Sequence, residues 1–149
     1  MATIDDLSTV LLVEDNPDDA ELIAHAFGKA GIGNPMIVVD DGEKATDYVH
    51  GRSAYADRRR FPVPGIILLD LKLPRRSGFE VLEAIRATEA TRRVPVVVLT
   101  SSSQEDDIRR AYDVGANSYL VKPIGRDALV TMVRSLDAFW MKLNQSAAS

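Results

Sequence analysis

The stretch IILLDLKLP, residues 66–74, places a carboxylate at the end of an apolar run. Residues 66–69 are four consecutive apolar side chains, a pattern typical of a strand buried on both faces of a parallel sheet. Asp70 follows directly, and a carboxylate beside a buried strand is costly unless other groups compensate its charge. The stretch therefore predicts a parallel sheet, with Asp70 at its edge as a carboxylate whose charge other groups must compensate.

Apolar runs alternate with segments of helical periodicity along the whole chain. The expected strands are residues 10–13, 36–39, 66–69, 94–99 and 118–121, and a helical pattern follows each of them. Five such units predict an α/β protein with a flavodoxin-like, doubly wound five-stranded parallel sheet and five helices. We expect Ser103 to open the fourth helix in a capping pattern, and the fifth helix to be long. The stretch 52–64 is expected to be a solvated loop or to extend the second helix in part.

Length and composition predict one domain of an ordinary water-soluble kind. The chain has 149 residues, no cysteine and a net charge of -4. We expect a short tail at 1–9, the domain at 10–143 with an extended last helix, and a tail at 144–149. The start of the chain lacks a signal-peptide pattern, and no apolar run reaches the roughly 18 residues of a membrane span. These features favour a cytoplasmic protein without a membrane or nucleic-acid partner.

Polar side chains with complementary chemistry follow four of the predicted strands. They are Glu14 and Asp15 after the first, Asp70 after the third, Thr100 after the fourth and Lys122 after the fifth. Two carboxylates about 5 Å apart repel by about 3 kcal/mol at an effective dielectric constant of about 20, and one lysine offsets only part of this for three acids. Oxygen ligands without histidine or cysteine favour a hard cation such as Mg²⁺. A carboxylate can also be a nucleophile for a phosphoryl group, whose oxygens the metal, ammonium and hydroxyl would neutralise.

Four motifs then give the chain a family resemblance. LLVEDNPDD (11–19), IILLDLKLPRRSGFEVL (66–82), VPVVVLTSS (94–102) and GANSYLVKPI (115–124) occur in the order and spacing of two-component response regulators. The chain resembles their receiver domain.

The resemblance implies a role for each residue of the predicted edge. Asp70 becomes the phosphoacceptor, and Mg²⁺ is held by Asp70, Glu14, Asp15 and the backbone carbonyl of Lys72. Thr100 and Tyr119 become switch residues that move after phosphorylation, and Lys122 pairs with the phosphoryl group. The bond between Lys122 and Pro123 is then expected to be cis. The protein would catalyse its own phosphorylation and dephosphorylation, without an external substrate.

Other interpretations of these residues stay open. Taken singly, Asp70 could be a turn or cap residue, the acidic pair could complement a helix dipole, and Lys122 could be a surface lysine. Asp70 could instead be the nucleophile of a phosphatase, although Lys72 and Leu73 supply no second acid. A receiver-like module that binds a partner without phosphorylation is a third interpretation.

The partners expected from the resemblance are a sensor histidine kinase and an unidentified downstream protein. The long connection before the third strand, the short N-terminal tail and the aromatic-ended last helix resemble stand-alone regulators paired with bacterial phytochromes. The apolar stripe expected to dock the last helix consists of Leu129, Met132, Val133 and Leu136. Phe139 and Trp140 follow this stripe, so we expect them to form a homodimer surface; the alternative is that Trp140 folds back over the fourth helix or the sheet edge of its own chain.

Overall fold

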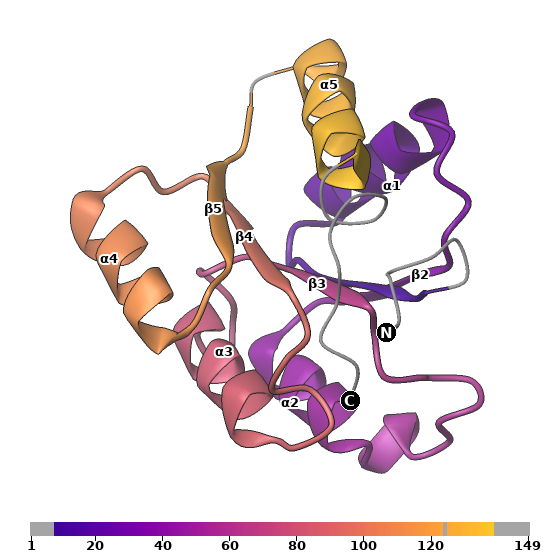
Figure 1. Cartoon of the computed structure of the whole chain (residues 1–149), viewed down its shortest axis with the longest axis vertical. Helices are drawn as coiled ribbons and strands as arrows, with labels where there is room; N and C mark the ends of the chain where they lie inside the picture. Colours follow the sequence, from indigo (N-terminus) through magenta and orange to yellow (C-terminus); the bar gives the residue numbers. More distant parts are fainter. Residues whose placement is uncertain (1–7, 124, 139–149) are drawn as a thin grey trace.

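The computed structural model describes residues 8–123 and 125–138. Its centre is one parallel sheet with the strand order β2-β1-β3-β4-β5 (Figure 1). The strands are β1 (Val10–Val13), β2 (Met36–Val39), β3 (Ile66–Leu69), β4 (Val96–Thr100) and β5 (Ser118–Val121). The helices are α1 (Pro17–Lys29), α2 (Gly42–His50), α3 (Gly78–Ala87), α4 (Glu105–Val114) and α5 (Arg126–Leu136), with a short 3₁₀ turn η1 (Ser53–Tyr55). The predicted fold class and flavodoxin-like strand order are confirmed.

Helices cover both faces of the sheet, which explains its continuous apolar strands. Alternate residues along β1 point to opposite faces: Leu11 and Val13 join the core beneath α2 and α3, and Val10 and Leu12 join the core beneath α1 and α5. Figure 1 shows these two helical layers on either side of the sheet, with α4 beside α3. Every residue of β1, β3 and β4 is buried. The carboxyl ends of the strands therefore form an edge held by a rigid core.

The connection between α2 and β3 is packed against the domain rather than simply solvated. Gly51 adopts the left-handed conformation (φ 63°) and ends α2, so the connection does not extend the helix. Tyr55 and Phe61 pack on the buried ring of Tyr48, with ring centroids 5.1 to 6.1 Å apart. Arg58 donates hydrogen bonds to the carbonyls of Val49 and Phe61 at 3.0 and 3.1 Å. Tyr55, Arg58 and Phe61 are thus half-buried, whereas most other residues of the stretch 52–64 are exposed, as expected for a solvated loop.

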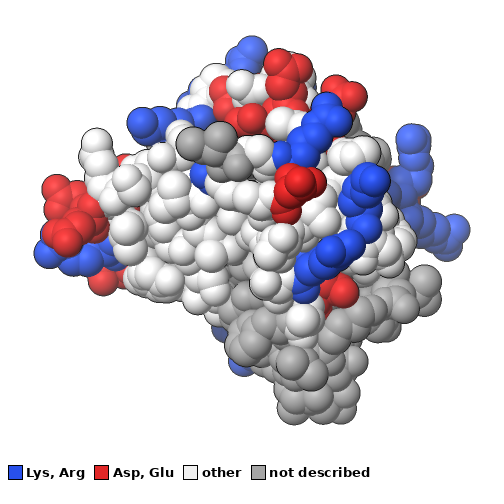
Figure 2. All heavy atoms as spheres, turned by 90° about the horizontal axis from the view of Figure 1, so that it is seen from above, with Lys and Arg blue, Asp and Glu red and all other residues white. Residues whose placement is uncertain are grey.

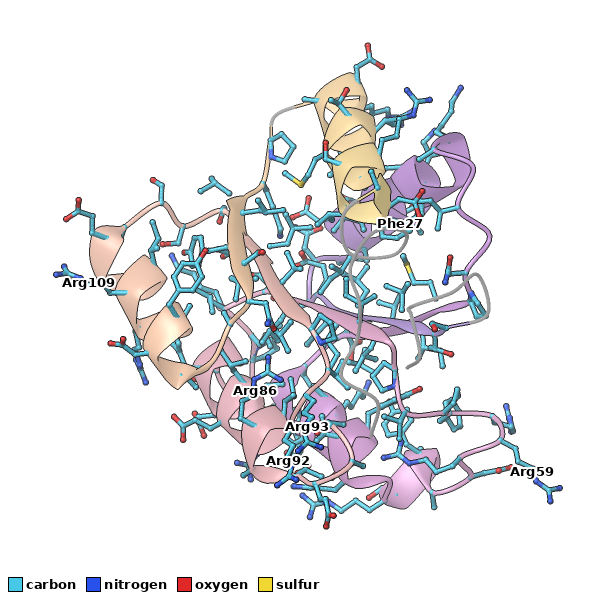
Figure 3. All side chains as sticks on the ribbon, viewed as in Figure 1. Phe27, Arg59, Arg86, Arg92, Arg93 and Arg109 are labelled. Atoms are coloured by element: carbon cyan, nitrogen blue, oxygen red, sulfur yellow. The ribbon has the colours of Figure 1, made fainter. Side chains whose placement is uncertain are left out.

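Arg86 of α3 joins the ends of two loops at the edge opposite the predicted site (Figure 3). Its guanidinium donates to the carbonyls of Gly115, Arg92 and Val94 and to Oδ1 of Asn117, at 2.7 to 3.1 Å. Arg92 and its neighbour Arg93 expose their own side chains. Arg86 is therefore a structural residue that fixes the start of β4 relative to the α4–β5 turn.

Two element boundaries differ from the sequence prediction. Strand β4 begins at Val96 rather than at residue 94, because Pro95 has no backbone N–H and the amide of Val96 bonds to Asn117. Ser103 does not cap α4: its N-cap is Gln104, without a side-chain cap, and Ser102 donates to Asp107 at 2.6 Å instead.

The end of the last helix is only partly described. Of the residues predicted to dock this helix, Leu129, Val133 and Leu136 are buried and Met132 is partly buried. The continuation to residue 143 and the contact residues Phe139 and Trp140 lie outside the described residues.

None of the helices in the described part of the chain has the length and apolar composition of a membrane span. On the face seen in Figure 2, both basic and acidic side chains are present among the described residues.

Candidate functional site

Asp70 lies directly after β3 and is nearly buried, with both carboxylate oxygens hydrogen-bonded. Oδ1 accepts a hydrogen bond from the Thr100 hydroxyl, with 2.8 Å between the two oxygens, and another from the amide nitrogen of Lys72 at 3.3 Å. Oδ2 accepts an N–H of Lys122 at 3.0 Å. The residues that follow β3, β4 and β5 are therefore brought together at this one carboxylate.

Three carboxylates meet where β1 and β3 end. One oxygen from each of Glu14, Asp15 and Asp70 lies within 4.8 Å of the others. Glu14 and Asp70 are buried and Asp15 is exposed, so the group is closed toward the core and open to solvent on one side. This donor set of carboxylate oxygens, with an open side for water, fits a hard divalent ion such as Mg²⁺.

Lys122 provides the positive charge of the site. Its ammonium is paired with Glu14, with Oδ2 of Asp19 at 3.0 Å and with Oδ2 of Asp70 at 3.0 Å. Burial alone would lower the pKa of Lys122, but the hydrogen bonds to Glu14, Asp70 and Asp19 raise it above its ordinary value. Lys122 is therefore held fully charged beside the acids.

Asp19 is a member of the site that the sequence analysis missed. It lies in the first turn of α1, where an acidic residue is expected simply because it complements the helix dipole. The sequence did offer one indication of its role: Asp19 comes four residues after Asp15, so the first turn of α1 lies at the same edge of the sheet. That the side chain of Asp19 reaches Lys122, the residue after β5, is not visible in the sequence.

The carboxyl group of Glu14 is buried beside another acid. Burial, together with the charge of Asp70, raises the pKa of Glu14 to about 7, although contact with Lys122 opposes this. Without a second cation, the charged form of Glu14 is thus disfavoured in the folded protein. A divalent ion would relieve this penalty because it favours the carboxylate form.

The two predicted switch residues are linked through Ser102. Thr100 is fully buried with its hydroxyl on Asp70, and the amide of Ser102 lies 3.5 Å from the Thr100 hydroxyl oxygen. Tyr119 donates its hydroxyl to the carbonyl of Ser102 at 2.9 Å. Because Ser102 also bonds to Asp107 of α4, the contacts at Asp70 continue to the start of that helix. The sequence analysis contained Ser102 only as the last residue of the motif at 94–102 and gave it no role.

Close backbone packing fixes the loop after Asp70. A Cβ on Gly78 would lie 2.2 Å from the carbonyl oxygen of Asp70, and one on Gly42 would lie 2.1 Å from the carbonyl oxygen of Arg76. The amide of Gly78 bonds to the carbonyl of Leu71 at 2.8 Å. Helices α2 and α3 therefore press directly on this loop, which a side chain at either glycine would displace.

One geometric expectation is wrong. No cis peptide bond occurs among the described residues, so the bond between Lys122 and Pro123 is trans. Trans is the ordinary state, since only about 5–6% of X–Pro bonds in folded proteins are cis, and the expectation rested on resemblance alone.

The family follows from comparison with known proteins. Residues 10–134 match the model of the response regulator receiver domain, which covers every strand of the sheet and all the site residues above. The chain belongs to the response regulator receiver family. Receiver domains are signalling modules, and the predicted resemblance is confirmed.

Individual relatives extend along most of this receiver. It is 41% identical to the probable methanogenesis regulatory protein FilR2 of Methanothrix harundinacea, over 92% of this chain and 86% of that protein. It is 36% identical to response regulator Rcp1 of Synechocystis, over 89% of this chain and 88% of the relative.

Solved structures give the same picture. Response regulator RPA3017, in red light signalling of R. palustris, superposes with a TM-score of 0.89 and 38% identity, covering 96% of this chain and 100% of that one. The phosphorylated cyanobacterial phytochrome response regulator RcpA gives 0.87 and 34%, covering 95% and 99%. The Mn²⁺-bound form of Rcp1 gives 0.84 and 35%, with the same coverage. The chain is therefore close in sequence and structure to phytochrome response regulators.

Proposed function

We propose that this receiver accepts a phosphoryl group on Asp70 and signals through the resulting change at its surface. One observation carries the proposal: Asp70 is in contact with Thr100 and Lys122 and also belongs to the three-carboxylate group. A hydroxyl, an ammonium and a hard-cation site around one carboxylate are the groups that phosphoryl transfer requires.

The metal site in this proposal consists of Glu14, Asp15, Asp70 and the backbone carbonyl of Lys72. Mg²⁺ bound there would neutralise phosphoryl oxygens, and the repulsion among the three acids favours its binding. The Mn²⁺-bound structure of Rcp1 supports a divalent ion in a related receiver.

The residues of the chain have separate parts in the transfer. A carboxylate oxygen of Asp70 forms a bond to phosphorus while the bond from phosphorus to the donor's leaving atom breaks. Lys122 donates N–H bonds to the phosphoryl oxygens, and the Thr100 hydroxyl turns from Asp70 to the phosphoryl group. Tyr119 follows, because its hydroxyl is bonded to Ser102 beside Thr100. The receiver catalyses this step and the later hydrolysis on itself, and no second acid follows Asp70 for work on an external substrate.

The proposed donor is the phosphohistidine of a cytoplasmic sensor histidine kinase, and more specifically of a bacterial phytochrome. Support comes from relatives described as phytochrome response regulators, including phosphorylated RcpA and the bacteriophytochrome response regulator RtBRR. The output is a contact with a downstream protein. Homodimer formation through Phe139 and Trp140 stays a prediction, since these residues lie outside the described part of the chain.

Intact-mass measurement tests the proposal. After incubation with phosphoramidate and Mg²⁺, the parent chain should gain one phosphoryl group. The gain should be absent with chelator and in the Asp70→Asn variant. A gain that persists in Asp70→Asn would show that another residue is modified and would refute the assignment.

A further inference from the structure

The ammonium of Lys122 has no N–H to spare in this structure. An ammonium has three N–H donors, and three described carboxylates, those of Glu14, Asp19 and Asp70, are paired with it. A phosphoryl group arriving at Asp70 can bind Lys122 only if one of these partners gives way.

The three partners differ in how easily they can lose the ammonium. The side chains of Glu14 and Asp70 are only 2% and 9% exposed, whereas that of Asp19 is 40% exposed. In the proposed reaction, Mg²⁺ would supply a second cation to Glu14 and Asp70, which belong to the three-carboxylate group, but not to Asp19. Water can replace the ammonium at the partly exposed Asp19. Asp19 is thus the partner that still holds Lys122 when the ion is bound and that must release it to a phosphoryl oxygen.

We infer that Asp19 is a positioning residue that competes with the incoming phosphoryl group for Lys122. The inference rests on the proposed function of Asp70. Asp19 holds the ammonium toward α1 in the unphosphorylated protein and thereby slows transfer to Asp70. Removing its charge leaves Lys122 free to bind a phosphoryl oxygen earlier in the reaction.

Phosphoramidate provides a transfer reaction whose atoms and charges are simple to follow. In its monoanion the nitrogen is protonated, so neutral ammonia leaves with the electron pair of the P–N bond. A carboxylate oxygen of Asp70 forms the new bond to phosphorus, giving the acyl phosphate. Lys122 is not consumed, so its effect is read as a rate.

The test compares the rate of phosphorylation of Asp19→Asn with that of the parent chain at fixed donor, Mg²⁺ and ionic strength. Asp18→Asn is the matched control, because Asp18 is exposed in the same first turn of α1 and has no ion pair among the described residues. We expect Asp19→Asn to react about two- to fivefold faster, the range for losing an ion pair to a partly exposed carboxylate. Asp18→Asn should react at the parent rate. Equal acceleration of both variants would indicate a general charge effect on the anionic donor and overturn the inference, as would an Asp19→Asn rate at or below the parent's.

A double-mutant cycle supplies a readout that a merely structural role would not change. With Lys122→Met as background, Asp19→Asn should no longer accelerate the reaction, and acceleration that persists there overturns the inference. In chelator, without donor, the effects of the two substitutions on unfolding free energy should also fail to add. If Lys122→Met reacts too slowly to follow, this coupling in unfolding free energy is the deciding measurement. Strict additivity of the two unfolding free-energy changes would then count against the inference. A parent chain that gains no phosphoryl group, with the coupling present, would instead refute the proposed function.

Discussion

Removing the charge of Asp15 should change how the fold responds to Mg²⁺. The oxygens of Glu14, Asp15 and Asp70 lie within 4.8 Å of one another. At that separation each pair of charges repels by about 3 kcal/mol at an effective dielectric constant of about 20. Asp15 is exposed, so solvent screening reduces the repulsion between its carboxylate and the other two to about 1 kcal/mol. In chelator, Asp15→Asn should therefore raise the free energy of unfolding by about 1 kcal/mol.

Mg²⁺ should stabilise the parent more than the variant. At a concentration 100 times its Kd, an ion that binds only the folded state adds about 2.7 kcal/mol. For a domain of this size, that corresponds to an increase in Tm of about 5–11 °C. Asp15→Asn should lose most of this gain because one ligand is gone.

Urea unfolding at constant ionic strength, with Mg²⁺ or with chelator, measures both effects. Asp18→Asn serves as the control, since Asp18 is also exposed but does not belong to the three-carboxylate group. It should keep the full response to Mg²⁺. A parent whose unfolding midpoint ignores Mg²⁺, or an Asp15→Asn variant with an unreduced response, would refute the reasoning.

Three further predictions concern the surroundings of the site. Gly78→Ala should lower the free energy of unfolding, measured in urea, by at least about 1–3 kcal/mol, because the added Cβ meets the backbone of Asp70. Gly28→Ala, in open space on α1, is the control and should raise it by about 0.4–1 kcal/mol. Equal effects of the two substitutions would contradict the close packing at Gly78. In chelator, the unfolding free energy should fall by up to about 3 kcal/mol as pH rises from 4.5 to 7, because the raised pKa of Glu14 means that the folded state holds this proton more tightly than the unfolded chain. Glu14→Gln should flatten that dependence, and an unchanged slope would argue against Glu14 as its source. Arg86→Met should cost about 2–3 kcal/mol by calorimetry through lost charge-assisted hydrogen bonds, whereas exposed Arg93→Met should stay within about 0.5 kcal/mol.

The sequence was most informative where burial alone decides structure. The runs at 10–13 and 66–69 became strands with the expected bounds, because residues buried on both faces must all be apolar. Once the strands are parallel, the residues after them must share an edge, so Asp70, Thr100 and Lys122 could be placed together in advance.

Features that depend on side-chain reach or local backbone geometry were not predictable. The contact of Asp19 with Lys122 joins α1 to the residue that follows β5, and the sequence does not show how far apart they lie. Ser102 rather than Ser103 stabilises the start of α4, because a shift of one residue in the loop decides which hydroxyl reaches Asp107. The role of Arg86 was not predicted, since two of its four acceptors, in Gly115 and Asn117, lie about 30 residues away in the sequence.

The most direct test of the account is to locate the phosphoryl group on the chain. Borohydride reduces an aspartyl phosphate to the alcohol homoserine, and trypsin releases residues 61–72 as one peptide in which Asp70 is the only carboxylic side chain. After phosphorylation with Mg²⁺, peptide mass spectrometry should find the reduced residue in this peptide alone. Reduction in the peptide that carries Glu14 and Asp15, or in none, would contradict the claim that Asp70 is the phosphoacceptor.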